Sequence, residues 1–157
     1  MRVLFVCLGN ICRSPTAEGV FRSRLDKAGL AERVEVDSCG TSDWHIGDPP
    51  DSRAVVAAKS RGVDLSQLRG RQLEEEDFRR FDYILAMDHM NLENLEALRP
   101  RDSQAHVGLF MAFAGRSDEA IPDPYTGDER HFEKVFDMIE AASDGLIEAL
   151  RRRLDTA

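Results

Sequence analysis

A cysteine and an arginine, separated by five residues, stand near the N-terminus in the stretch VLFVCLGNICRSP, from Val3 to Pro15. A cysteine thiolate is a nucleophile, and the planar guanidinium of arginine presents a fork of donors that matches phosphate oxygens. Cys7 and Arg13 could therefore attack and hold a phosphate group. The spacing alone is weak support, because free cysteines often pack as small buried hydrophobes.

The residues between this cysteine and this arginine favour a loop that binds an oxyanion. Gly9 can adopt positive φ without strain, and Asn10 tolerates it better than most residues, so successive N–H groups can point into one concavity. Ser14 is a candidate cap for a following helix, or a hydrogen-bond partner of the sulfur, and Pro15 suits a first helical turn. The helix N-terminus would face the same concavity, where helix dipoles and cations lower the pKa of a thiol. The residues predicted to bind the phosphate are Leu8, Gly9, Asn10, Ile11, Cys12 and Ser14.

Strands and helices that alternate along the chain must position this loop. The predicted strands are Arg2–Val6, Arg33–Ser38, Tyr83–Met87 and His106–Phe113. The predicted helices are Ser14–Ala28, Asp51–Arg61, Glu74–Phe81, Asp88–Leu98 and a long amphipathic helix near the C-terminus. The predicted loops are Cys39–Pro50 and Ile121–Glu129. This alternation predicts an α/β fold with a mostly parallel sheet covered on both faces, and a site at the carboxyl ends of its strands.

Apolar residues spaced three and four apart predict the buried face of each helix. In the first helix these residues are Ala17, Val20, Phe21, Leu25 and Ala28. In the helix before Pro100 they are Leu92, Leu95 and Leu98. In the last helix they are Phe132, Val135, Phe136, Ile139, Leu146, Ile147 and Leu150.

Length, charge and cysteine content narrow the class of protein. The chain has 157 residues, about one domain's worth, and we expect a single domain over residues 1–157. Its net charge of −8 argues against a general nucleic-acid binder. No apolar run approaches the roughly 18 residues of a membrane span, and the short N-terminal run lacks a signal-peptide cleavage site. Three cysteines are an odd, low number for a disulfide framework, so we expect a cytoplasmic protein.

Four segments, in the same order along the chain, resemble segments of one protein family. The segment VCLGNICRSPTAEGVF resembles the signature loop of the low-molecular-weight protein tyrosine phosphatases. VDSCGTSDWHIGDPPD resembles their second strand and specificity loop, FDYILAMD their third strand, and DPYTGD their acid loop. The resemblance covers nearly the whole chain. It implies a three-layer α/β/α, flavodoxin-like fold with a four-stranded parallel sheet, and hydrolysis of phosphotyrosine through a cysteinyl-phosphate without a cofactor.

Asp123 is the candidate general acid and base of this reaction. One carboxyl group can protonate the leaving phenolate and later activate the attacking water. Pro124 disfavours helical geometry at Asp123, but the chain has 29 acidic residues, so the assignment depends on the family's matching Asp-Pro-Tyr. Tyr125 could stack on the substrate ring. Many members of the family have a second tyrosine after Asp-Pro-Tyr, where this chain has Thr126. The rim of the site therefore has one aromatic residue fewer, and regulation by phosphorylation of that tyrosine is not expected here.

The remaining candidates have both a structural and a functional interpretation. Trp44 could belong to the core, but its loop and the family's aromatic residue at this place favour a wall of the substrate site. Cys12 could simply pack, and the resemblance supports a reversible disulfide with Cys7 after oxidation. Buried packing is the expectation for Cys39, and Asn10 and Ser38 are expected to hold the shape of the loop. The four histidines show no metal-ligand spacing, so no metal is expected.

Three other functions are compatible with a loop of this kind. A thiol-dependent arsenate reductase needs resolving cysteines, but none follows Cys39. Related protein-arginine phosphatases resemble GNTCRSP, whereas this chain has the apolar Ile11, which suits a phenyl ring better than a guanidinium. A non-enzymatic phosphate-binding module usually lacks the nucleophile or the acid, and here Cys7, Arg13 and Asp123 are all present.

The resemblance also implies the partners of the protein. These are phosphotyrosine proteins, with an autophosphorylating tyrosine kinase as one candidate, and inorganic phosphate as a product that inhibits. Nucleic acids and membranes are not expected as partners. The sequence leaves the physiological substrate and the oligomeric state open.

Overall fold

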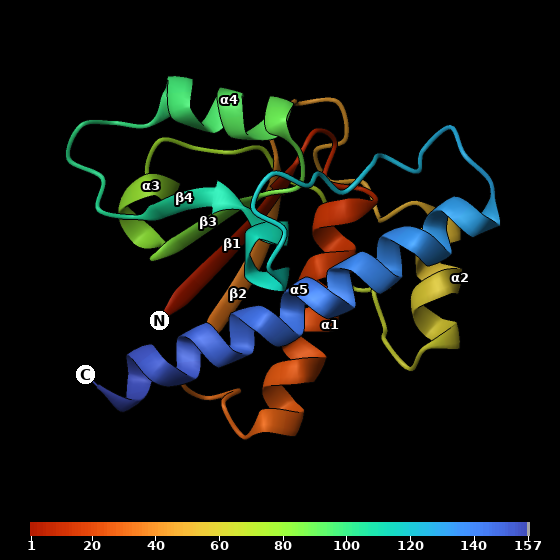
Figure 1. The fold of residues 1–157 in the computed structure, drawn as a ribbon. Coiled ribbons are helices and arrows are strands. Elements are labelled where there is room, and N and C mark those ends of the chain that lie inside the picture. Colours follow the sequence, from red (N-terminus) through yellow and green to blue (C-terminus); the bar gives the residue numbers. More distant parts are fainter. Residues whose placement is uncertain (157) are drawn as a thin grey trace.

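Four parallel strands form the centre of the molecule, and helices cover both faces of the sheet (Figure 1). The computed structural model describes residues 1–156. The strands lie in the order β2-β1-β3-β4, and their bounds are β1 Arg2–Cys7, β2 Glu35–Gly40, β3 Tyr83–Ala86 and β4 His106–Leu109. The helices are α1 Arg13–Ala28, α2 Ser52–Ser60, α3 Asp77–Arg80, α4 His89–Leu98 and α5 Glu129–Asp155, with the 3-10 helix η1 at Phe110–Ala114. The predicted α/β fold with a four-stranded parallel sheet is confirmed.

The central strand β1 is apolar on both faces because helices cover both. Val3 and Phe5 pack into the larger core cluster, with residues of α1, α2, η1 and α5. Leu4 and Val6 pack into a smaller cluster on the opposite face, with residues of α3 and α4. Burial on both faces explains why the strand is a continuous apolar run rather than an alternating one.

The candidate loop leaves the sheet where the strand order reverses. β2 lies on one side of β1 and β3 on the other, which makes the carboxyl end of β1 a topological switch point. Open α/β sheets bind their ligands in the crevice at such a point. β1 ends at Cys7, so the fold places this cysteine at the expected edge.

Several predicted element bounds were wrong. Residues 110–114 form η1 instead of extending β4, and Gly115 ends this turn with a left-handed φ of 78°. The short apolar run around Phe110 fits a strand and a buried turn equally well, so periodicity could not separate the two. Leu98, predicted to face inward, is 56% exposed because α4 ends there, whereas Leu95 is fully buried.

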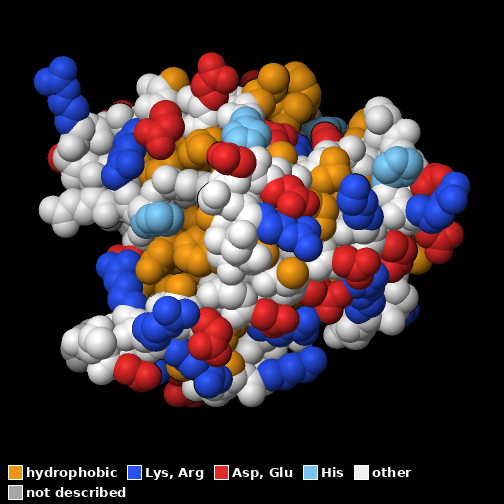
Figure 2. All heavy atoms as spheres, viewed as in Figure 1, with side chains coloured by type: hydrophobic (Ala, Val, Ile, Leu, Met, Phe, Trp, Pro, Cys, Tyr) orange, Lys and Arg blue, Asp and Glu red, His pale blue; other side chains and the backbone are white. Residues whose placement is uncertain are grey.

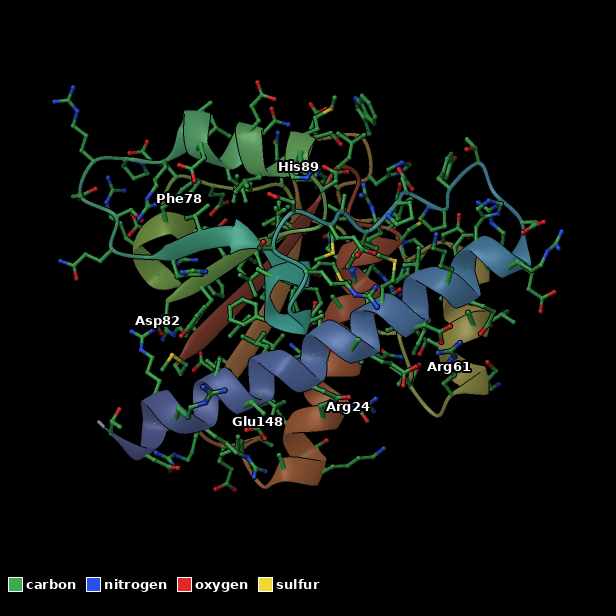
Figure 3. All side chains as sticks on the ribbon, viewed as in Figure 1. Arg24, Arg61, Phe78, Asp82, His89 and Glu148 are labelled. Atoms are coloured by element: carbon green, nitrogen blue, oxygen red, sulfur yellow. The ribbon has the colours of Figure 1, made fainter. Side chains whose placement is uncertain are left out.

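Charged side chains of both signs are interspersed over the face seen in Figure 2. Ion pairs account for part of this pattern along α5, where Arg24 of α1 contacts Glu140 and Asp144. Arg61, which follows α2, also lies against α5 and pairs with Asp137 at 2.8 Å (Figure 3). Among residues 1–156, none of the helices combines the length and the apolar composition that crossing a bilayer requires.

Candidate active site

Cys7 is the last residue of β1, and its buried sulfur lies beside the first turn of α1. The Ser14 hydroxyl is 2.9 Å from the sulfur, and the backbone N–H of Asn10 donates to the sulfur at 3.3 Å. Donors of this kind stabilise a thiolate more than a thiol. The short connection between β1 and α1 therefore curls around the sulfur.

The conformation of the loop agrees with the sequence at one residue and differs at another. Asn10 has a φ of 58°, in the left-handed region predicted for it. Gly9 could adopt positive φ without strain, but its φ does not lie in that region. Gly9 instead leaves room for a neighbour, because a Cβ there would lie 3.1 Å from the His45 ring.

The Asn10 side chain holds the loop in place. Its amide nitrogen donates to the hydroxyls of Ser14 at 2.8 Å and Ser38 at 3.0 Å, and its carbonyl accepts from the Arg71 N–H at 3.0 Å. Ser38 in turn donates to Glu18 at 2.7 Å. Burial raises the pKa of Glu18, a residue that the sequence analysis did not single out.

Of the two roles predicted for Ser14, the helix cap was wrong and the hydrogen bond to the sulfur is confirmed. The N-cap residue is Cys12, and no side chain caps the helix. Ser14 lies inside the first turn of α1, and its hydroxyl is hydrogen-bonded to the Cys7 sulfur and the Asn10 amide instead. Pro15 lies in the first turn, as predicted.

Arg13 is almost completely buried, and its guanidinium is held from two other segments. Nη1 donates to Asp88 at 2.6 Å and to the backbone carbonyl of Ile121 at 2.9 Å. Nη2 lies 3.8 Å from a carboxylate oxygen of Asp123. Asp88 stands directly after the strand segment FDYILAM, yet nothing in the sequence paired it with Arg13.

A cavity of about 220 Å³ opens above the sulfur. Its lining residues are Cys7, Leu8, Gly9, Ile11, Cys12, Arg13, Trp44, His45, Asp123 and Tyr125. Trp44 is 68% exposed and Tyr125 is 50% exposed, so both stand on the rim and Trp44 is not a core residue. His45, which was expected on the surface or in packing, also lines the cavity and is held by Asp48 at 3.1 Å.

Two residues predicted to bind the phosphate lie behind the cavity. Asn10 and Ser14 are buried and do not line it, so their contacts support the loop from below. Cys12 lines the cavity beside Cys7, and burial raises the pKa of its thiol. Cys39 is fully buried in the smaller core cluster, where packing was expected.

Asp123 lies in the irregular segment between η1 and α5. One of its carboxylate oxygens accepts a hydrogen bond from the Tyr125 N–H at 3.0 Å, and the side chain remains 46% exposed. The carboxyl group therefore faces the same cavity as the Cys7 sulfur, next to the Arg13 guanidinium. Within residues 1–156, no cluster of three or more histidine, cysteine or acidic side chains could hold a metal ion.

Known proteins resemble this chain over nearly its whole length. A sequence profile described as "Low molecular weight phosphotyrosine protein phosphatase" matches residues 2–156. The low molecular weight phosphotyrosine protein phosphatase of Schizosaccharomyces pombe is 42% identical over 152 residues, which cover 96% of this chain and 97% of that protein. A protein tyrosine phosphatase of Entamoeba histolytica has a crystal structure that matches with a TM-score of 0.92 and 38% identity, over 97% of both chains. A Drosophila arginine phosphatase matches with a TM-score of 0.89 and 33% identity, over 96% of this chain and 98% of that chain.

Proposed function

The chain belongs to the low molecular weight phosphotyrosine protein phosphatase family of phosphoric monoester hydrolases, and on this premise we propose that it hydrolyses phosphotyrosine and other aryl phosphates through a cysteinyl-phosphate. The observation that carries the proposal is the shared cavity of Cys7, Arg13 and Asp123. The nucleophile, a cationic clamp and a carboxyl group all line this cavity.

In the first step, the Cys7 thiolate attacks the phosphorus and forms a sulfur–phosphorus bond. The phosphorus–oxygen bond to the tyrosine ring breaks, and Asp123 gives its proton to the departing phenolate. Arg13 and the loop N–H groups stabilise the charge on the equatorial oxygens of the transferring group. Asp88 and the Ile121 carbonyl keep Arg13 in position for this contact.

In the second step, Asp123 acts as a carboxylate and takes a proton from a water molecule. The water oxygen attacks the phosphorus, the sulfur–phosphorus bond breaks, and inorganic phosphate and the Cys7 thiolate are released. The same donors that assist the first step stabilise the second transition state. The Ser14 hydroxyl and the Asn10 N–H donate hydrogen bonds that stabilise the negative charge as it returns to the sulfur.

The walls of the cavity favour an aromatic phosphoester over phosphoarginine. Trp44 and Tyr125 stand on the rim and Ile11 lines the wall, so the group entering the cavity meets apolar surface. A phenyl ring buries against such surface, whereas a guanidinium would lose hydrogen bonds there. No cysteine follows Cys39, so the chain lacks the downstream cysteines that the arsenate reductases use.

The substrates that this site fits are phosphotyrosine side chains of proteins, with an autophosphorylating tyrosine kinase as one candidate. Inorganic phosphate would bind the same loop as the product and inhibit. We place the reaction in the cytoplasm, where a reducing environment keeps the Cys7 thiol available.

The direct test measures phosphate release from a phosphotyrosine peptide and a phosphoarginine peptide side by side, with Cys7→Ser as the blank. We expect fast release from phosphotyrosine alone, dependent on Cys7. Release mainly from phosphoarginine would overturn the substrate assignment, and release that persists in Cys7→Ser would overturn the nucleophile.

A further inference from the structure

One side chain from another segment, that of Arg53, is hydrogen-bonded to the backbone of residues 122–127, the stretch that carries Asp123. Arg53, in the first turn of α2, donates through Nη2 to the Tyr125 carbonyl at 2.7 Å and through Nη1 to the Gly127 carbonyl at 3.2 Å. Within residues 1–156, these are the hydrogen bonds that reach residues 122–127 from another segment of the chain. The loop itself has no regular secondary structure.

The other edge of the same guanidinium is fixed to the loop that carries Cys7. Arg53 donates through Nε and Nη2 to the two carboxylate oxygens of Asp51, at 3.1 Å and 2.9 Å. The Asp51 N–H in turn donates to the Ile11 carbonyl at 2.8 Å. Arg53 also lowers the pKa of the Asp51 carboxyl, so this partner stays ionised.

Two aromatic rings set the orientation of the guanidinium. Its central carbon lies 4.7 Å from the centre of the Phe132 ring, at the start of α5, and 5.7 Å from the centre of the Tyr125 ring. A planar cation stacked on rings and bonded along two edges has little rotational freedom. A lysine would keep the charge at this place but not the paired hydrogen bonds.

The position of Asp123 depends on these contacts because its own are few. The carboxylate is bonded to the Tyr125 N–H within its own loop, and Arg13 lies 3.8 Å away, beyond hydrogen-bond distance. The loop is anchored at its start by Ile121, whose N–H donates to the Met87 carbonyl at 2.8 Å and whose carbonyl accepts from Arg13 Nη1 at 2.9 Å. Beyond that anchor, the Tyr125 carbonyl held by Arg53 is the next fixed point, two residues after Asp123.

We propose that Arg53 is a positioning residue for general acid–base catalysis, which fixes the height of the Asp123 loop above the Cys7 loop. The proposal rests on the hydrolytic function proposed above. Arg53 neither gives nor takes a proton. It acts through Asp123, because a carboxyl group assists proton transfer only when it is held within reach of the leaving oxygen.

The test compares Arg53→Met and Arg53→Lys with the wild type on aryl phosphates whose leaving groups differ in basicity. We expect Arg53→Met to lower kcat/KM for phenyl phosphate about tenfold, since misplacing an acid removes part of its contribution. The activated substrate 2,4-dinitrophenyl phosphate needs little protonation, so its kcat/KM should change by less than about twofold. Arg53→Lys should fall between wild type and Arg53→Met.

The matched control is Arg130→Met. Arg130 follows the same loop, at the start of α5, and its side chain is 93% exposed. Among residues 1–156, its side chain pairs with Asp128 alone, at 3.5 Å. We expect wild-type kcat/KM for both substrates in this variant. Thermal unfolding of all variants shows whether a loss of activity reflects a loss of folding.

A double-mutant cycle separates positioning from a general structural role. In the Asp123→Asn background, Arg53→Met should lower kcat/KM for phenyl phosphate by less than about twofold, because the group it positions is gone. An equal loss on both substrates, or a full loss in the Asp123→Asn background, would overturn the proposal while leaving the function intact. A wild-type protein without Cys7-dependent aryl phosphatase activity would overturn both.

Discussion

At the scale of single residues, the chemistry of the cavity depends on which atoms the protein has already bonded. The Nη1 atom of Arg13 is occupied by Asp88 and the Ile121 carbonyl, while Nη2 lies on the side of Asp123. The sulfur of Cys7 is hydrogen-bonded to the Ser14 hydroxyl and the Asn10 N–H, and Cys7 also lines the cavity. Each of these two side chains is therefore held on one side and faces the cavity on the other.

Replacing Asp123 tests the acid role of its carboxyl group. In Asp123→Asn, we expect kcat/KM for phenyl phosphate to fall about 100-fold or more, the usual contribution of general acid catalysis. The fall should be much smaller for 2,4-dinitrophenyl phosphate, whose leaving group departs without a proton. A plot of kcat/KM against leaving-group pKa measures this, and equal effects on both substrates would argue against an acid role.

Cys12 offers a second residue-scale prediction, because it lines the cavity beside Cys7. Peroxide should oxidise Cys7 to a sulfenic acid, and the Cys12 thiol should then displace water to form a disulfide. Wild-type activity should return fully when dithiothreitol reduces this bond. In Cys12→Ser, recovery after the same treatment should fall, and equal recovery in both proteins would contradict a protective disulfide.

At the scale of elements, the end of β2 and the Cys7 loop touch through their backbones. Gly40, the last residue of β2, has no side chain, and a Cβ built there would lie 2.7 Å from the Leu8 carbonyl oxygen. Two residues after the strand ends, the Ser42 N–H donates a hydrogen bond to the same Leu8 carbonyl at 3.0 Å. Glycine is therefore required at this position by close approach rather than by φ.

Gly40→Ala should disturb this contact. We expect a loss of about 1–3 kcal/mol in the free energy of unfolding, the usual cost of overpacking, and a fall in kcat/KM because the Cys7 loop must shift. Gly108→Ala is the control, since a Cβ there would meet only a flexible His106 side chain at 3.3 Å. Chemical denaturation and aryl phosphate kinetics measure both effects, and a Gly40→Ala protein as stable and active as wild type would contradict the contact.

The order of elements and the location of the site were predictable because they are local properties of the chain. About 30 residues are enough to predict the first strand, the loop and α1. They contain the apolar run ending at Cys7, the turn residues after it and the amphipathic pattern of α1. The partners of the reacting groups were not predictable in this way. Asp88 and Arg53 come to the site from distant segments, and one aspartate or arginine among many carries no signal of its contacts.

The predictions were wrong where the local sequence was compatible with two structures. Ser14 fits a helix cap by type, but the buried sulfur and the Asn10 amide take its hydroxyl. The run after Leu109 fits a strand by composition, but the chain turns into η1, which packs against α5. In both cases tertiary contacts decided between two locally acceptable conformations.

At the scale of the whole molecule, α5 closes one face of the sheet and is held by arginines from two other helical segments. Arg24 of α1 bonds Glu140 and Asp144, and Arg61 after α2 bonds Glu133, Asp137 and Glu140. The guanidinium of Arg61 also lies 4.6 Å from the centre of the Phe136 ring. A network of this kind stabilises more than isolated surface ion pairs do.

Arg61→Met should lower the free energy of unfolding by about 1–2 kcal/mol, because it leaves several carboxylates without their cation. Arg130→Met is the control, and we expect a change within about 0.5 kcal/mol for this exposed residue. Urea denaturation monitored by circular dichroism measures both. Equal stability of Arg61→Met and wild type would show that the network contributes little to holding α5.

The central claim, a covalent phosphate on Cys7, can be measured directly. Wild-type protein mixed with p-nitrophenyl phosphate, quenched in acid during turnover and digested, should show a phosphate adduct by mass spectrometry on the peptide that contains Cys7. The adduct should be absent from Cys7→Ser, which should also lack activity. Steady turnover without any adduct at Cys7, or an adduct on another residue, would contradict the mechanism.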